Sequence, residues 1–71
     1  MAKNISKGRI IADFNMMKDF ELSARDYYAK VAGNPQITDA RLQRTFGAIA
    51  KDEQRHADIV REIINIIEAS L

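Results

Sequence analysis

The sequence predicts an all-α fold, an antiparallel two-helix hairpin that pairs with a second copy of itself as a four-helix bundle. Three observations support it: two long stretches with helical spacing of apolar residues, a helix-breaking segment between them, and more apolar positions than two helices can enclose. Residues 1–71 form a single domain, and a domain this small buries only about 60% of its unfolded surface. Because no cysteine is present, a metal or a second chain is expected to stabilise it.

A first helix is expected from about residue 8 to residue 32. Alternating steps of four and three residues along it define a heptad series, the first seam, in which every side chain except that of Glu21 is apolar or aromatic. The first seam consists of Ile10, Phe14, Met17, Glu21, Ala24, Tyr28 and Val31. The carboxyl group of Glu21 is therefore expected in the middle of an apolar face.

The segment GNPQITD, residues 33–39, separates the two helices. Gly33 is typical of a helix C-terminus, and Pro35 forces Asn34 out of helical geometry. Thr38 or Asp39 is expected to cap the next helix. A connection this short makes the two helices antiparallel neighbours.

A second helix is expected from about residue 38 to residue 69. The same heptad steps define the second seam, which is apolar at both ends and ionisable in the middle. The second seam consists of Leu42, Phe46, Ile49, Glu53, His56, Val60, Ile63 and Ile67. In an antiparallel hairpin Glu21 and Glu53 lie at the same height to within roughly one helical turn, and His56 projects from the same face as Glu53.

A dimer of such hairpins brings four carboxylates and two imidazoles together, because each copy contributes Glu21, Glu53 and His56. A buried ionised carboxylate is unfavourable unless a charge or hydrogen bonds compensate it, and two divalent cations would balance the four carboxylates. Oxygen-rich ligands with one imidazole per metal favour iron, with manganese as the alternative, over zinc-thiolate or copper sites. The sequence therefore predicts Glu21, Glu53 and His56 as metal-binding and catalytic residues of a site with two metal ions per dimer.

A set of residues on both helices carries a family resemblance. These residues are Glu21, Ala24, Tyr28, Ala32, Phe46, Ala50, Glu53, His56 and Ala57. Their pattern resembles the ferritin-like superfamily, in particular rubrerythrin-type half-bundles and the encapsulated ferritins. The resemblance extends from about Phe14 to Ile67.

The resemblance implies a ferritin-like four-helix bundle with a di-iron site assembled across a homodimer or a larger even-numbered homo-oligomer. It implies that Glu21, Glu53 and His56 bind the metals, that Tyr28 lies beside them, and that the protein oxidises Fe(II) with dioxygen or peroxide as a ferroxidase does. The sequence ends at IIEASL without the third helix and shell-targeting tail of encapsulated ferritins, so no shell protein is expected as a partner. Without a rubredoxin-like segment, a self-contained rubrerythrin peroxidase is not expected either.

Charge and hydropathy narrow the classes of partner. Eleven Lys and Arg against ten Asp and Glu give a formal charge of +1, with the two signs interleaved along the chain. This balance predicts binding neither to nucleic acid nor to an anionic membrane. Because the sequence has neither a signal-peptide core nor an apolar run of membrane-spanning length, a soluble cytoplasmic protein is expected.

The residues leave two alternatives open. A Glu-x-x-His pair is common on helix surfaces, so the chain could be a metal-free hairpin dimer in which the seam polar residues only fix the register. Such a dimer would act as a protein or nucleic-acid interaction module through Arg41, Arg44 and Lys51. The second alternative is a single metal per chain with an open position for hydrolysis. Ferroxidase, peroxide-reducing and manganese sites would share the same ligands, so the sequence does not separate them.

Overall fold

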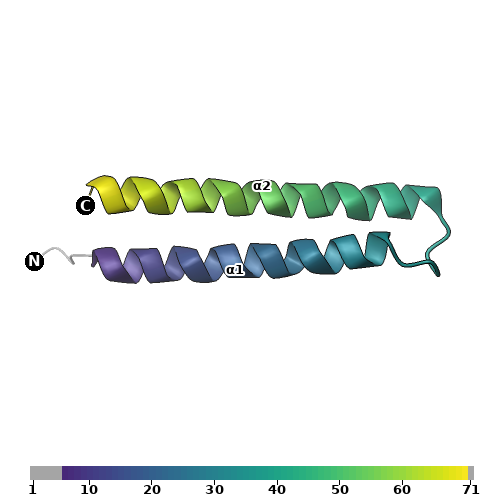
Figure 1. Cartoon of the computed structure of the whole chain (residues 1–71), viewed down its shortest axis with the longest axis horizontal. Helices are drawn as coiled ribbons and strands as arrows, with labels where there is room; N and C mark the ends of the chain where they lie inside the picture. Colours follow the sequence, from purple (N-terminus) through teal and green to yellow (C-terminus); the bar gives the residue numbers. More distant parts are fainter. Residues whose placement is uncertain (1–5, 71) are drawn as a thin grey trace, which may run out of the picture.

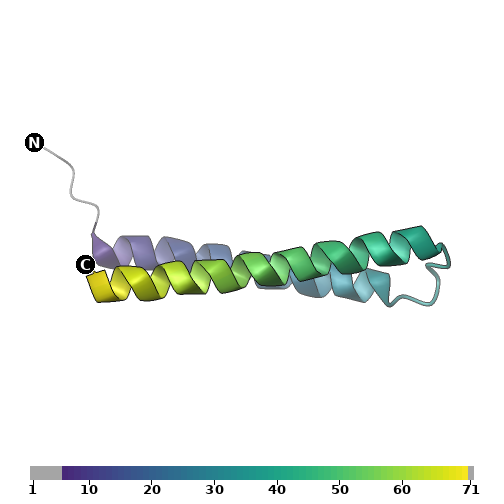
Figure 2. The ribbon, with the colours of Figure 1, turned by 90° about the horizontal axis from the view of Figure 1, so that it is seen from above.

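Residues 6–70 are described by a computed structural model, and this part of the chain forms two α-helices and no β-strand (Figure 1). α1 spans Lys7–Ala32 and α2 spans Ala40–Ser70. The helices lie side by side and antiparallel, and α2 crosses α1 at a shallow angle (Figure 2). The all-helical hairpin predicted from the sequence is thus confirmed, whereas its pairing as a four-helix bundle stays a prediction.

The ends of α1 follow from the hydrogen bonding of two residues. The side chain of Ser6 accepts a hydrogen bond of 3.0 Å from the backbone N–H of Arg9, which satisfies one of the free N–H groups of the first turn. At the other end, the N–H of Gly33 donates to the carbonyl oxygen of Ala29 at 3.0 Å. The φ of Gly33 is −89°, a value open to any residue, so α1 ends here without using the conformational freedom of glycine.

Asp39 is the residue that starts α2. Its Oδ1 accepts hydrogen bonds from the backbone N–H groups of Arg41 at 2.8 Å and Leu42 at 3.3 Å. α2 therefore begins at Ala40, slightly later than the sequence predicts, because Asp39 is its cap. The hydrogen bonds from these N–H groups, that of Arg41 foremost, lower the pKa of Asp39, so the carboxylate stays ionised at the positive end of the helix.

The contact between the helices is narrow. Four residues of α2 are buried, namely Ala50, Ala57, Val60 and Ile64, whereas no residue of α1 is fully buried. Ala50 and Ala57 stand about one helical turn before and after Glu53 on α2. A hairpin with so few buried side chains has a small hydrophobic core of its own.

The line of closest helix contact differs from the predicted second seam. Ala50, Ala57 and Ile64 lie on the contact line but not on the seam, whereas Leu42 of the seam remains exposed. The difference has a geometric reason. In a pair of helices the residues that face the other helix are buried, whereas in a four-helix bundle the seam residues face the central axis of the bundle, which lies to one side of each pair. The predicted seams therefore border an open side of the hairpin.

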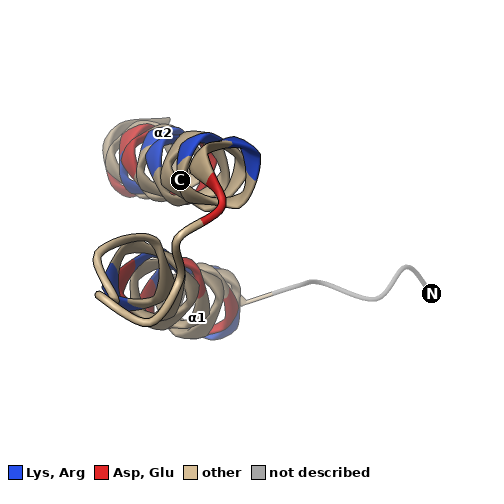
Figure 3. Cartoon of the chain, turned by 90° about the vertical axis from the view of Figure 1, so that its right-hand side faces the viewer, with Lys and Arg blue, Asp and Glu red and all other residues tan. Residues whose placement is uncertain are grey.

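The described surface combines apolar and charged side chains. Seven large apolar residues are exposed: Met16, Met17, Phe20, Tyr27, Leu42, Ile59 and Ile66. Both helices carry basic as well as acidic side chains (Figure 3). Neither α1 nor α2 contains an apolar stretch long enough to cross a membrane.

Gly47 in α2 provides a first test of the fold. A Cβ at this position meets no atom within 4 Å and the helix has no positive φ here, so Gly47→Ala should raise the free energy of unfolding by about 0.5–1 kcal/mol. Urea unfolding followed by circular dichroism measures the change. A loss of stability instead would indicate that another chain approaches the backbone at Gly47.

Candidate metal centre

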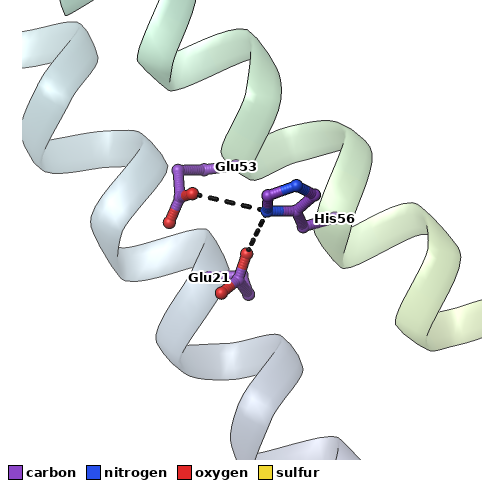
Figure 4. Close-up of side chains that lie close together, drawn as sticks. All are labelled: Glu21, Glu53 and His56. Carbon is purple, nitrogen blue, oxygen red and sulfur yellow. Dashed lines mark hydrogen bonds and ion pairs between the residues drawn. The ribbon is translucent and has the colours of Figure 1, made fainter.

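Three ionisable side chains meet near the middle of the hairpin. Glu21 comes from α1, and Glu53 and His56 come from successive turns of α2 (Figure 4). Their adjacency has two causes: three residues separate Glu53 from His56, which places both on one helix face, and the antiparallel packing brings Glu21 to the same height. The structure thus brings together all three residues that the sequence predicts as metal ligands.

The ring nitrogen Nδ1 of His56 lies between the two carboxylates. It is 3.1 Å from Oε2 of Glu21 and 3.6 Å from Oε1 of Glu53, and one ligand atom from each residue lies within 4.8 Å of the others. Neighbouring ligands of an octahedral ion with bonds of about 2.1 Å lie about 3.0 Å apart. Nδ1 of His56 and Oε2 of Glu21 already lie at about this spacing, whereas the group as a whole spans up to 4.8 Å, so the side chains would have to draw closer together to share one ion.

The two carboxylates are largely buried, whereas the imidazole is not. The exposed fraction of the side chain is 20% for Glu21, 19% for Glu53 and 50% for His56. An ionised carboxylate only accepts hydrogen bonds, so His56 must donate Nδ1–H to Glu21. Among residues 6–70 the only ion-pair partner of either carboxylate is His56, so one imidazole faces two negative charges. This imbalance favours binding of a cation.

One side of the cluster is open. A hollow beside it is lined by Met17, Glu21, His56, Ile59 and Val60, and the side chains of Met17 and Ile59 at its rim are about half exposed. One chain would therefore offer three ligand atoms from one direction and would leave the remaining positions of a six-coordinate ion uncovered. The apolar rim is the part of the hairpin that a second chain would cover.

A polar bridge links the helices next to the cluster, and the sequence did not reveal it. Arg25 of α1 donates to the side-chain oxygen of Gln54, whose nitrogen donates to Asp58 at 3.0 Å. Arg25 is partly buried and spans the two helices. The bridge links α1 to α2, and the guanidinium of Arg25 bonds to Gln54 and Asp26 rather than to Glu53.

Tyr28 packs one heptad from the cluster. Its ring stacks on that of Phe46 with 6.0 Å between ring centroids, and Tyr27 meets its edge at 5.8 Å. Within the described residues no hydrogen bond joins its hydroxyl to Glu21 or Glu53. Tyr28 thus forms the aromatic layer at one end of the cluster, and its role beside the metals stays a prediction.

Comparison of the chain with protein-family models, with curated proteins and with solved structures finds no match. The ferritin-like resemblance therefore stays a prediction that depends on the residues of the cluster and their positions.

Proposed function

We propose that two copies of this chain form a four-helix bundle whose centre binds two iron ions through Glu21, Glu53 and His56 of each copy, and that this site oxidises Fe(II). The observation that carries the proposal is the cluster itself: two largely buried carboxylates share one imidazole at the edge of an open apolar hollow. Exposed carboxylates are common without a metal, whereas these two are only 20% and 19% exposed and share one imidazole, so a cation would offset the charge that the imidazole does not.

Charge balance supports a pair of divalent ions. A dimer joined through the open side would hold four carboxylates and two imidazoles, the ligand set of di-iron and di-manganese helical bundles. Two divalent cations offset the four negative charges, while the imidazoles contribute neutral nitrogen ligands. A single hairpin offers half of this set, so the proposal requires the dimer.

The residues of the chain have separate roles in this site. Glu21 and Glu53 would hold the ions from opposite helices and keep them at a fixed spacing as their charge rises. His56 would bind through Nδ1, the nitrogen that faces both carboxylates, as a neutral imidazole whose remaining proton is on Nε2. When bound, a pair of iron ions supplies electrons to dioxygen or peroxide. Because the incoming Fe(II) is itself the reductant, no second cofactor is needed.

Oxygen consumption tests the proposed activity. Oxygen added to the Fe(II)-loaded protein should be consumed faster than in protein-free buffer with the same iron, because the carboxylates hold two ions side by side. The variant Glu53→Gln should fall to the buffer rate, whereas Glu62→Gln, on the exposed side of α2, should match the parent. A parent no faster than buffer would contradict the ferroxidase proposal even if iron binds.

A further inference from the structure

A second apolar feature lies on α1, apart from the cluster. Met16, Phe20 and Tyr27 have exposed fractions of 70%, 74% and 64%, and neither the contact with α2 nor the candidate metal centre involves them. They are spaced along one line of the helix, with exposed polar residues between and beyond them. This line, called the outer stripe, consists of Asp13, Met16, Phe20, Ser23, Tyr27 and Lys30. Its steps of three and four residues are those of a heptad series.

We propose that the outer stripe binds the outer stripe of a second copy of the chain, antiparallel, about a two-fold axis between Glu21 and Leu22. This register places Asp13 opposite Lys30 of the other copy, Met16 opposite Tyr27, and Phe20 opposite Ser23. Each pairing occurs twice, as a two-fold contact requires. The proposal goes beyond the metal site and does not rest on it.

The charges at the two ends of the stripe determine whether the two copies of α1 pair parallel or antiparallel. An antiparallel contact brings a carboxylate against an ammonium group at each end, through Asp13 and Lys30. A parallel contact would bring Asp13 against Asp13 and Lys30 against Lys30, and like charges in one layer are unfavourable. The end charges of two stripes therefore attract each other only in the antiparallel orientation.

The shape of the stripe agrees with that register. A hollow on α1 is lined by Asp13, Met16, Met17 and Phe20, which are residues i, i+3, i+4 and i+7 of the helix. Four residues at this spacing form the hole that receives one side chain of a facing helix in knobs-into-holes packing. In the antiparallel register Tyr27 of the other copy stands over this hollow, where its ring would contact the apolar residues and its hydroxyl could donate to Asp13.

Two different contact faces would make an assembly larger than a dimer. The proposed bundle contact uses the side of the hairpin that carries His56 and Ile59, whereas the outer stripe lies on another side of α1. Of the residues that line the hollow beside the cluster and the hollow on the outer stripe, only Met17 belongs to both. Two separate two-fold contacts on one chain link dimers into larger even-numbered assemblies.

Sedimentation of the parent and of Phe20→Glu tests the outer stripe. The parent should have at least twice the mass of Phe20→Glu. The variant should keep the helix content and the iron per chain of the parent, because Phe20 is 74% exposed and is not part of the cluster. Equal masses for the two proteins would overturn the proposal. Glu53→Gln should show the opposite result: it should lose iron but still associate through the outer stripe. The two measurements, iron per chain and mass of the assembly, therefore distinguish failure of the metal site from failure of the stripe.

Charge exchange tests the register. Asp13→Lys and Lys30→Asp should each lower the mass, because each places like charges in the end layers, and the double variant Asp13→Lys with Lys30→Asp should restore it. A double variant with no more mass than the single variants would overturn the antiparallel register. Both positions are exposed. Asp13→Lys also replaces the Arg9–Asp13 ion pair within α1 by two like charges, so Asp13→Asn, which removes the pair without a new charge, is the matched control for helix content.

Discussion

Replacing Glu21 by leucine should stabilise the metal-free dimer while it removes iron binding. In the absence of metal, Glu21 is a largely buried carboxylate whose only ion-pair partner among residues 6–70 is a half-exposed histidine. Replacing a buried ion pair by apolar side chains is often neutral or stabilising, by up to about 4 kcal/mol, and here His56 keeps Glu53 as its partner when Glu21 is removed, so no charge loses its only partner. The dimer would cover Glu21 further, so a gain in this range is expected for Glu21→Leu.

Urea unfolding of the metal-free proteins, at one protein concentration and followed by circular dichroism, measures this effect. The matched control is Glu62→Leu, which makes the same change on an exposed position of α2 and should move the midpoint little. If Glu21→Leu is no more stable than the parent, Glu21 does not lie in the core of a dimer. In that case the face of α1 that carries Glu21 would not be the face that points into a bundle.

Loss of one ligand should remove the metal and leave the helices intact. We expect His56→Ala and Glu53→Gln each to weaken Fe(II) or Mn(II) binding by at least about 100-fold, since even the loss of a group that only supports a ligand costs 10–100-fold. The far-ultraviolet circular dichroism should stay unchanged, because the buried residues of the hairpin are Ala50, Ala57, Val60 and Ile64.

Anaerobic equilibrium dialysis against Fe(II), repeated with Mn(II), measures this loss of affinity. Glu62→Gln removes the same charge from the exposed face and should bind as the parent does. Parent affinity in His56→Ala would show that the imidazole is not a ligand. An affinity loss as large in Glu62→Gln would show that the effect is general electrostatics.

Local signals in the sequence predicted the helices well. Pro35 and the capping residues at the break affect only the backbone of residues close to them in the sequence. The end of α1 and the start of α2 therefore lie close to where they were expected. The meeting of Glu21, Glu53 and His56 was also predictable, because helical spacing and antiparallel direction together fix height and face.

Two features required the structure. Apolar periodicity marks an arc of a helix but not which part of the arc faces the neighbouring helix, so Ala50 and Ala57 were not singled out as the contact line. The bridge from Arg25 through Gln54 to Asp58 depends on the reach of long side chains across two helices, which spacing along one helix does not reveal.

The native mass spectrum of the protein loaded anaerobically with Fe(II) and freed of excess metal tests the central claim most directly, because it gives subunit number and bound metal together. The shared-site account predicts an even-numbered assembly with one iron per chain. An assembly without iron would contradict it and favour the metal-free interaction module, and a monomer with one iron would contradict the dimeric site in favour of a single-metal centre.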